Sequence, residues 1–435
     1  MKKIITYGTY DLFHEGHYNM LKRAKAEGDY LIVGVTGDRY DVGRGKLSVK
    51  DSLSTRIENV KKTGFADMII TEEYLGQKIS DIIKYDIDTF VIGDDWRGKF
   101  DHLNNYCKVK YISRTEGISS TKLRETEFKI NTIGIITDKV SDNQIVKEAN
   151  LIAGVKIGKV YSDADGVAEA FAERYKVDSI AGSIEELCDD SDVIFIRVDV
   201  ADRYRYAKAV LEAGVHVICD FPFSLESSRQ KELWNLSKEQ NKILLDNIKA
   251  PYSQTFIQMI WAVQGGLIGD VIDFNCSVSK KDKNIPYLFY ELAGMATVPM
   301  LKILGHDYVN MDSRLIYEDD SIEFATMYFD YPKGRAKINV GNKVRVENQM
   351  EIIGTKGTIR IGDNWWKADY FEMEKTDGSS QVFNINFDSN GFRFLLANLV
   401  DMISEGIIET KFFSEKDSLK VTAILEEAIG KDREE

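Results

Sequence analysis

Two histidines near the N-terminus, three residues apart, are the residues whose types and spacing most directly suggest chemistry. His14 and His17 close the segment Gly8-Thr9-Tyr10-Asp11-Leu12-Phe13-His14-Glu15-Gly16-His17. The apolar run 3–7 before it predicts a strand, and the amphipathic run 18–25 after it predicts a helix. The pair is therefore expected at a helix N-terminus, where free N–H groups and the helix dipole favour phosphate. Two imidazoles add donors that can follow charge between phosphate oxygens, which suits cleavage of a nucleoside triphosphate at its α-phosphate without a protein nucleophile.

The elements that must position this pair alternate between strands and helices. Short apolar runs predict strands at 4–7, 30–35, 68–70, 89–92 and 109–112, with helical patterns at 54–63 and 77–85 between them. This alternation indicates a doubly wound parallel sheet, whose ligands bind at the carboxyl ends of the strands. The polar residues expected just past those ends are Thr9, Asp11, His14, His17, Asp38, Asp95 and Arg114.

Three separated segments resemble the nucleotidyltransferase superfamily, which contains cytidylyltransferases and pantetheine or nicotinamide adenylyltransferases. The first is the histidine segment, which resembles the superfamily's phosphate-binding signature. The second, Arg114-Thr115-Glu116-Gly117-Ile118-Ser119-Ser120-Thr121, resembles the RTxGISTT signature of the CTP-dependent branch. The third, residues 91–101, is similar to the segment after the fourth strand of glycerol-3-phosphate cytidylyltransferases. The resemblance covers residues 1 to about 125, with the motifs in the family's order.

The resemblance implies a role for each matching residue. His14 and His17 would contact the CTP phosphates and stabilise the α-phosphorus during in-line attack, and the planar Arg114 guanidinium would hold the β- and γ-phosphates. The implied nucleotide-binding residues are Thr9, Tyr10, Asp11, Gly16, Asp95, Trp96, Thr115, Ser119 and Ser120. The implied acceptor-phosphate contacts are Arg44, Lys46 and Arg56. Plain structural roles stay open: solvated loop charges for Arg44 and Lys46, a turn cap for Asp95, and packing for Trp96.

No general base is required, because a phosphate dianion is already a nucleophile and positioning with charge neutralisation supplies the acceleration. The family implies Mg²⁺ arriving with CTP, and we assign no residue as a certain metal ligand. One position departs from the family pattern. The arginine often found before the aromatic residue is Gly64 here, in Gly64-Phe65-Ala66-Asp67, so a nucleotide contact is absent or supplied elsewhere.

A second strand–helix alternation begins at Ile130. Strands are expected at 131–137, 158–161, 192–196 and 215–219, and helices at 143–152, 166–175 and 202–213, which predicts a second Rossmann-like sheet. Later segments at 274–279, 322–329, 337–340, 349–353 and 357–361 alternate apolar and polar residues, which predicts an open, largely antiparallel sheet. The expected fold class is α/β, with a cytidylyltransferase domain at 1–128, a Rossmann-like domain at 130–250 and an α+β domain at 251–435.

From Ile130 onward the chain resembles the glucose-fructose oxidoreductase / inositol dehydrogenase family, through segments 168–175, 183–187, 211–219 and 353–359. The residues for redox chemistry differ. Segment 134–142 has one glycine, Gly134, where the dinucleotide fingerprint needs several. The ribose-binding acid falls at Ser162, beside Asp163. The family's lysine aligns with Phe221 and its acid/base histidine with Met295, and neither side chain transfers protons. We therefore expect the fold without the dehydrogenation, as a scaffold, dimerisation unit or binding module, with NAD(P) a doubtful cofactor; a diverged redox site is the alternative.

Composition limits the partners and the compartment. The net charge of −13 and the pI of about 5.1 argue against nucleic acid and anionic membranes as partners. Four cysteines without metal-type spacing suggest a reducing compartment. With no signal peptide and no membrane-spanning run, we expect a cytoplasmic protein. In the resembled oxidoreductase family the late sheet packs against a second subunit, which implies a homodimer or higher homo-oligomer; Trp365-Trp366 belongs to that interface or to the core.

The leading expectation is transfer of CMP from CTP to a small polyol phosphate, most closely glycerol 3-phosphate, which gives a CDP-polyol and pyrophosphate for a surface polymer such as teichoic acid or a capsule. A first alternative is a bifunctional enzyme whose second half reduces a keto-sugar phosphate with NAD(P) and supplies the polyol phosphate. A second alternative is a non-enzymatic nucleotide or sugar sensor, which would require the nearly complete transferase motifs to be idle.

Overall fold

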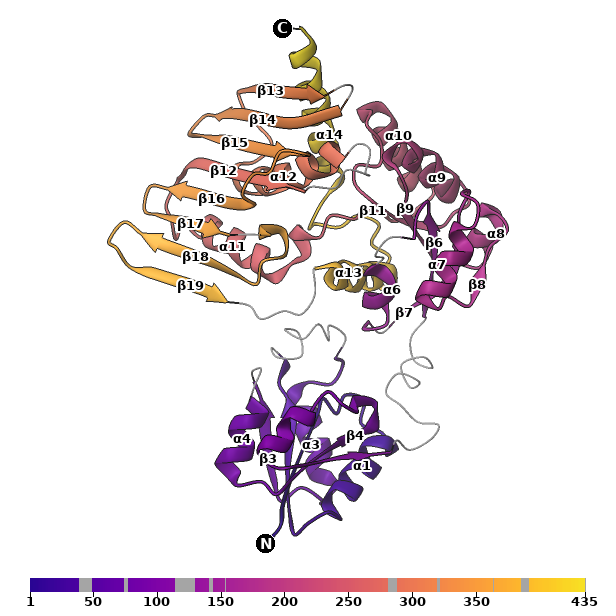
Figure 1. Cartoon of the computed structure of the whole chain (residues 1–435), viewed down its shortest axis with the longest axis vertical. Helices are drawn as coiled ribbons and strands as arrows, with labels where there is room; N and C mark the ends of the chain where they lie inside the picture. Colours follow the sequence, from indigo (N-terminus) through magenta and orange to yellow (C-terminus); the bar gives the residue numbers. More distant parts are fainter. Residues whose placement is uncertain are drawn as a thin grey trace. The chain divides into compact units, whose positions relative to one another are not determined.

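The computed structural model describes residues 1–38, 49–73, 77–113, 130–140, 144–152, 154–280, 288–318, 321–362, 364–384 and 391–434. The chain divides into two compact units, one formed by Met1–Ile130 and the other by nearly all of the chain from Asn131 onward. Both units are built from strands and helices in alternation, and the second also contains a large mixed sheet (Figure 1). The expected α/β fold class is confirmed.

The described residues of the first unit form a five-stranded parallel sheet in the order β3-β2-β1-β4-β5. Its strands are β1 (Lys3–Gly8), β2 (Tyr30–Thr36), β3 (Met68–Glu72), β4 (Thr89–Gly93) and β5 (Lys108–Ile112). The chain runs outward from β1 in one direction and then returns to pair β4 with the other side of β1. The strand order therefore reverses between β1 and β4, which is where ligands bind in open parallel sheets.

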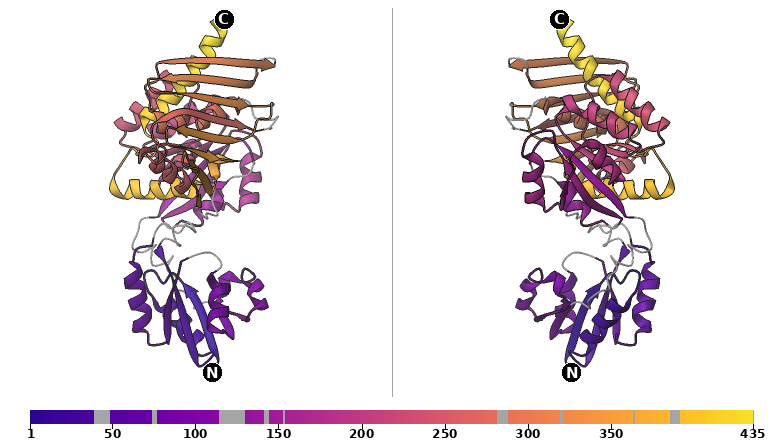
Figure 2. Two further views of the ribbon diagram at one scale, coloured as in Figure 1. Left: turned by 90° about the vertical axis from the view of Figure 1, so that its left-hand side faces the viewer. Right: turned by 90° about the vertical axis from the view of Figure 1, so that its right-hand side faces the viewer.

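Helices cover both faces of this sheet (Figures 1 and 2). On one face, α1 (Glu15–Lys25) and α3 (Leu53–Lys62) bury Leu21 and Val60 against β1 and β2. On the other face, α4 (Gln77–Tyr85) buries Ile82. Two short 3-10 helices, η1 (Asp94–Trp96) and η2 (Asp101–Asn105), connect β4 to β5. Helix α1 begins three residues earlier than its amphipathic pattern predicts, because His14 caps it.

The second unit begins with a six-stranded parallel sheet in the order β11-β10-β9-β6-β7-β8. The strands are β6 (Asn131–Thr137), β7 (Val155–Tyr161), β8 (Ser179–Ile180), β9 (Val193–Arg197), β10 (His216–Cys219) and β11 (Leu244–Asp246). The helices are α6 (Gln144–Ala149), α7 (Val167–Tyr175), α8 (Ile184–Asp189), α9 (Val200–Glu212) and α10 (Ser227–Glu239). Here the order reverses between β6 and β9, as in doubly wound dinucleotide-binding folds, which confirms the predicted second Rossmann-like sheet.

The remaining strands form an eight-stranded sheet in the order β13-β14-β15-β12-β16-β17-β18-β19. They are β12 (Val271–Ser279), β13 (Asn310–Glu318), β14 (Ser321–Tyr331), β15 (Gly334–Gly341), β16 (Gln349–Gly354), β17 (Gly357–Ile361), β18 (Tyr370–Lys375) and β19 (Ser380–Asn384). Only the β12–β15 pairing is parallel. The predicted largely antiparallel sheet is confirmed, although β13, β18 and β19 were not predicted.

Helices complete the second unit. They are α11 (Gln254–Gln264), α12 (Leu288–Leu304), α13 (Phe392–Glu405) and α14 (Glu415–Glu434), with the 3-10 turns η3 (Ala250–Tyr252) and η4 (Trp365–Lys367). Figure 1 shows α11, α12 and α14 on one face of the large sheet. Trp365 is buried in this core, and its indole donates a hydrogen bond to the carbonyl of Ser277 (3.2 Å). No helix in the described ranges is long and apolar enough to cross a membrane.

A buried carboxyl at the end of β11 makes the stability of the second unit depend on pH. Burial raises the pKa of Asp246 well above its usual range, and the nearby Asp417 carboxylate adds to the shift, although Ser418 donates a hydrogen bond to Asp246. A carboxyl with a raised folded-state pKa costs nothing below its unfolded pKa and destabilises the fold progressively as pH rises.

We therefore expect Asp246→Asn to raise the free energy of unfolding at pH 8 by about 1 kcal/mol or more, and to leave it nearly unchanged at pH 4. Urea unfolding at both pH values measures this difference. Asp165→Asn, at an exposed position, is the control and should shift neither value. Equal stability of wild type and Asp246→Asn across the pH range would contradict the prediction.

Candidate active site

The two histidines lie side by side at the N-terminus of α1. His14 is the N-cap, and its Nδ1 accepts a hydrogen bond from the backbone N–H of Gly16 (3.0 Å). In a neutral His14 the proton therefore resides on Nε2, the nitrogen away from the helix. The His17 ring stacks on that of His14, with centroids 3.9 Å apart and an interplanar angle of 19°. The structure thus brings both imidazoles to the positive end of a helix dipole.

The loop between β1 and α1 holds this pair in an uncommon backbone conformation. Tyr10 and Leu12 have φ values of 56° and 47°, in the left-handed region that non-glycine residues rarely adopt. The Tyr10 ring is buried and meets the His17 ring edge-on at 5.5 Å, and Phe13 contacts His17 at the same distance. Gly8 allows this packing, because a Cβ there would lie 2.9 Å from the Tyr10 ring. In this structure the side chain of Tyr10 supports His17.

Asp11 connects this loop to the segment before α3. Its side chain is buried, and Oδ1 accepts hydrogen bonds from the backbone N–H groups of Lys50 and Asp51, both at 2.9 Å. In the opposite direction, Asp51 Oδ2 accepts a hydrogen bond from the backbone N–H of Leu12 (3.0 Å). Asp51 could not be recognised as a supporting residue from the sequence, because a lone acid before a helix resembles an ordinary cap. These reciprocal bonds fix the histidine loop against α3.

Arg56 of α3 is the other element of this support. Its side chain is fully buried. Nη1 donates to the carbonyls of Thr9 (2.8 Å) and Thr36 (2.7 Å), Nε donates to the carbonyl of Asp51 (3.0 Å), and Nη2 pairs with the Asp38 carboxylate. The guanidinium therefore joins the ends of β1 and β2 to the start of α3. This placement differs from the expected contact with an acceptor phosphate, since the donors face backbone within the protein.

The residues after β4 lie at the same edge of the sheet as the histidine loop, because β1 and β4 are adjacent and parallel. Asp95 is exposed in η1, and Gly93 gives it room, since a Cβ there would lie 2.5 Å from Asp95 Oδ1. Trp96 is half-buried, with its ring 5.8 Å from that of Phe100 and the Lys99 ammonium 4.8 Å above it. Both positions border the place where the strand order reverses.

Six of the expected site residues, Arg44, Lys46, Arg114, Thr115, Ser119 and Ser120, lie outside the described residues. The chain that leads to the last four is placed, however. Ser113 follows β5, and its carbonyl accepts a hydrogen bond from Nη1 of Arg23 on α1 (2.7 Å). At the departure from the family pattern, Gly64 has a φ of 71°, a conformation that glycine adopts without strain.

The described part of the first unit is suited to stabilising phosphate charge. Two stacked imidazoles and the start of α1 supply donors at one edge of the sheet. No group of three or more histidine, cysteine or acidic side chains is placed to hold a metal ion among the described residues. Asp11 binds backbone N–H groups and Asp38 pairs with Arg56, which suits a supporting role for both carboxylates.

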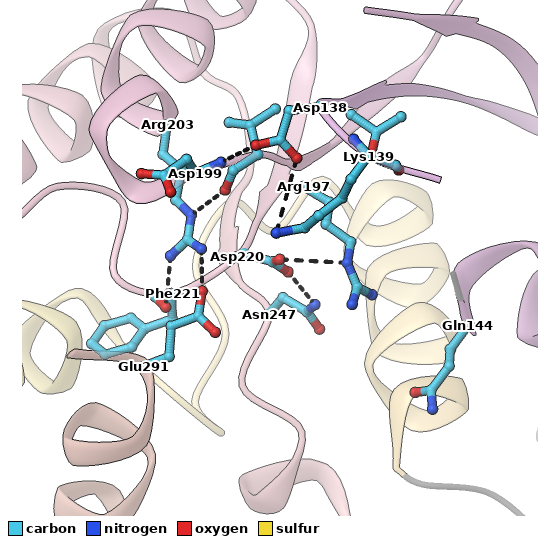
Figure 3. A network of polar contacts seen from close by, with 12 residues as sticks. Asp138, Lys139, Gln144, Arg197, Asp199, Arg203, Asp220, Phe221, Asn247 and Glu291 are labelled. Carbon is cyan, nitrogen blue, oxygen red and sulfur yellow. Dashed lines mark hydrogen bonds and ion pairs between the residues drawn. The ribbon is translucent and has the colours of Figure 1, made fainter. Parts of the chain in front are cut away.

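The second unit has a polar network at the equivalent edge of its parallel sheet, which Figure 3 shows from close by. Lys139 follows β6, Arg197 ends β9, Asp220 follows β10 and Asn247 follows β11. The Arg197 Nε lies 3.9 Å from Asp220 Oδ2, and the Asn247 amide donates to Asp220 Oδ1 (2.6 Å). This network could not be predicted from the sequence, because its members are separated by up to about a hundred residues.

The residues at this edge do not fit the usual arrangement for hydride transfer with a nicotinamide dinucleotide, the cofactor that the fold implies. At the end of β6 the Asp138 carboxylate accepts from the backbone N–H of Asp199 (2.7 Å), so an acid stands where a pyrophosphate needs donors. The Asp163 carboxylate, the candidate ribose ligand, instead accepts from the hydroxyls of Tyr161 and Tyr206.

The position of the family's lysine is also filled differently. The Phe221 ring is buried against α12, where a Cβ on Gly294 would lie 2.3 Å from it. Next to it, the buried Arg203 donates to the carbonyl of Phe221 (2.9 Å) and pairs with Glu291 (Figure 3). These contacts hold the strand end against α12, and the Phe221 ring at the position of the family's lysine carries no transferable proton.

Comparison with known proteins finds a family model that matches part of each unit. A cytidylyltransferase-like family model matches residues 5–126, and a model of the oxidoreductase family with an NAD-binding Rossmann fold matches residues 133–247. Glycerol-3-phosphate cytidylyltransferase of Bacillus spizizenii is 52% identical over 125 residues, which are 29% of this chain and 96% of that protein. The Staphylococcus aureus protein of the same name is 46% identical over 125 residues, 29% of this chain and 94% of its own.

A solved structure shares the fold of the second unit. KijD10, a 3-ketoreductase from Actinomadura kijaniata crystallised with NADP and TDP-benzene, superposes with a TM-score of 0.62 at 16% identity, over 69% of this chain and 98% of its own. At that identity the likeness concerns the fold. Because the first unit covers nearly the whole length of relatives with about half of their residues identical, the chain belongs to the cytidylyltransferase-like family through residues 5–126, followed by a unit with the Rossmann fold of the oxidoreductase family.

Proposed function

We propose that the chain transfers CMP from CTP to glycerol 3-phosphate or a closely similar polyol phosphate. An acceptor phosphate oxygen forms a bond to the α-phosphorus of CTP, the bond between the α-phosphorus and the β-phosphate oxygen breaks, and pyrophosphate leaves. The observation that carries the proposal is the stacked His14–His17 pair at the start of α1, in a segment half identical to proteins named glycerol-3-phosphate cytidylyltransferase. Thus the named partners are two small molecules, CTP and a polyol phosphate.

The residues of the chain act in this reaction by positioning and by charge. His14 presents Nε2–H, because its Nδ1 accepts a hydrogen bond from the backbone N–H of Gly16. The centroid of the His17 ring lies 3.9 Å from that of His14, so both imidazoles can stabilise the charge that develops on phosphate oxygens. Arg56 and Asp11 keep the loop that carries both histidines in place. Mg²⁺ would be held by the phosphates of CTP, and it would supply neutralisation of their negative charge.

The product class suggests the wider role. A CDP-polyol carries an activated polyol phosphate, which a further transferase can add to a growing polymer, so we place the chain in synthesis of a surface polymer such as teichoic acid or a capsule. CTP is an intracellular nucleotide, and we accordingly propose a cytoplasmic site of action. We also propose self-association through the large sheet of the second unit, which sedimentation of the full chain would measure.

Incubation of the full chain with labelled CTP, Mg²⁺ and a panel of phosphates tests the activity. The panel contains glycerol 3-phosphate, ribitol 5-phosphate, phosphocholine and phosphoethanolamine. We expect pyrophosphate release and a labelled CDP product with glycerol 3-phosphate at the highest kcat/KM. Absence of pyrophosphate release with every acceptor would contradict the proposed activity. A preference for an aminoalcohol phosphate would contradict only the assignment of the acceptor.

A second candidate function is a reductase in the second unit that makes the polyol phosphate for the first. The match to an NAD-binding oxidoreductase model over residues 133–247 favours it and runs against the expectation of an inert scaffold. The engaged Asp163 and the apolar Phe221 and Met295 weigh against the family's own chemistry. Oxidation of NADPH or NADH by the full chain with dihydroxyacetone phosphate or ribulose 5-phosphate tests it, and no oxidation with either substrate would remove this candidate.

A further inference from the structure

Asp51, which lies outside the histidine segment, contacts the loop between β1 and α1 through its backbone and its side chain. Its backbone N–H donates to Asp11 Oδ1 (2.9 Å), and its Oδ2 accepts from the backbone N–H of Leu12 (3.0 Å). Its carbonyl accepts from Nε of the buried Arg56 (3.0 Å). Asp51 therefore connects the loop that carries His14 to the most deeply buried cation of α3.

The residue that the Asp51 carboxylate holds has a strained backbone. Leu12 has a φ of 47°, in the left-handed region, where the side chain of a non-glycine residue crowds the backbone. Such a conformation persists only where surrounding contacts hold it. The bond from the Leu12 N–H to Asp51 fixes the peptide group before Leu12, and a carboxylate is a strong acceptor for such a bond. Without this bond, the peptide group can rotate and Leu12 can relax to a negative φ.

A change of conformation at Leu12 would move both imidazoles. His14 follows Leu12 by two residues, so the φ of Leu12 sets the direction in which the chain reaches His14. The ring of Phe13, between them in sequence, lies 5.5 Å from the ring of His17, and the His14 ring stacks on His17 at 3.9 Å. The position of the histidine pair therefore depends on the conformation that Asp51 holds.

We propose that Asp51 is a positioning residue for cytidylyl transfer, an inference that rests on the proposed function. Its carboxylate keeps Leu12 in the left-handed conformation, and this places His14 and His17 against the phosphates of CTP. Asp51 acts through the backbone of the loop and touches neither substrate. The position of its acceptor oxygen matters more than its charge, because an uncharged oxygen at the same place can accept the same hydrogen bond.

Three variants of the full chain test this role. Asp51→Ala removes the acceptor of the Leu12 N–H, and Asp51→Asn removes the charge but keeps an amide oxygen that can accept the bond. The matched control is Asp88→Ala. Asp88 Oδ2 accepts from the backbone N–H of Lys3 (2.7 Å) at the start of β1, so this control removes a bond of the same kind at the opposite edge of the sheet.

We expect Asp51→Ala to lower kcat about tenfold or more, because a small displacement of a catalytic group has a large effect on rate. The KM for glycerol 3-phosphate should stay within about threefold of the wild-type value, since Asp51 does not bind the acceptor. Asp51→Asn should keep most of kcat, and Asp88→Ala should leave kcat unchanged. A purely structural role would lower the stability of both alanine variants and change kcat per folded molecule in neither. Initial rates of pyrophosphate release, with urea unfolding of each variant, measure these quantities.

An unchanged kcat in folded Asp51→Ala would overturn the proposal. An equal loss of kcat in Asp51→Asn and Asp51→Ala would also overturn it, because the charge of Asp51 would then be the requirement. Should Asp51→Ala fail to fold, Asp51→Ser gives the same comparison, since its hydroxyl is too short to reach the Leu12 N–H. Each of these outcomes requires an active wild-type chain, whereas a wild-type chain that releases no pyrophosphate contradicts the proposed function itself.

Discussion

His17→Ala is expected to lower kcat for cytidylyl transfer about 10²–10³-fold, and His14→Ala is expected to do the same. Removing one preorganised donor to developing charge in a water-poor site typically has an effect of this size. Because the two rings are stacked and are proposed to act together on the phosphates of CTP, the double variant should lose far less activity than the product of the single losses. Initial rates of pyrophosphate release at saturating CTP and acceptor measure all three.

Two matched variants separate catalysis from folding. His14→Asn keeps a side-chain acceptor at the N-cap of α1, so the helix should remain stable while activity falls as in His14→Ala. His102→Ala removes an exposed histidine from η2 and should leave kcat unchanged. Activity of His17→Ala within tenfold of wild type, with glycerol 3-phosphate as acceptor, would contradict the role assigned to the pair.

Arg56→Met is expected to lower the free energy of unfolding of the first unit by about 3–5 kcal/mol. The substitution fills similar volume but leaves the carbonyls of Thr9, Thr36 and Asp51 without their buried donor. Arg56→Lys keeps one charge and loses the fork, so its destabilisation should be smaller. Urea unfolding followed through loss of cytidylyl transfer reports on this unit alone.

The control for this experiment is Lys61→Met, an exposed position of the same helix, which should change stability by less than about 0.5 kcal/mol. One outcome for Arg56→Met would instead support the acceptor-binding role that the family resemblance implies for Arg56. If Arg56→Met unfolds like wild type but raises KM for glycerol 3-phosphate alone, Arg56 binds the acceptor and the buried contacts are incidental to stability.

The parallel sheets could be predicted from sequence because their strands are short apolar runs separated by amphipathic helices. β1, β2 and β4 appear within a residue or two of the expected ranges, as do β6, β9 and β10. Helices and strands that lack one buried apolar face and one exposed polar face could not be predicted from the sequence. Helix α12 is buried on nearly all sides, so its sequence Leu288–Leu304 shows little 3.6-residue periodicity. Strand β19 lies at one edge of the large sheet and is exposed along nearly its whole length, so its sequence carries no apolar pattern.

In the candidate site, too, some features could be predicted from the sequence and others could not. The spacing of His14 and His17 at a strand–helix junction predicts that both imidazoles meet at a helix N-terminus, and the structure places them there. That Tyr10 supports His17, or that Arg56 faces the interior, depends on which atoms surround each side chain. A basic residue matched to a family position carries no information about the direction of its guanidinium.

The sequence by itself determined the family of the first unit, the alternation of strands and helices, and the position of the histidine pair, because these depend on local patterns within about ten residues. Only the tertiary structure decided which polar groups share a strand edge. Lys139, Arg197, Asp220 and Asn247 come together because parallel strands end at one edge of the sheet. Such neighbours are distant in sequence, and their contacts arise from the order of the strands, which no local pattern specifies.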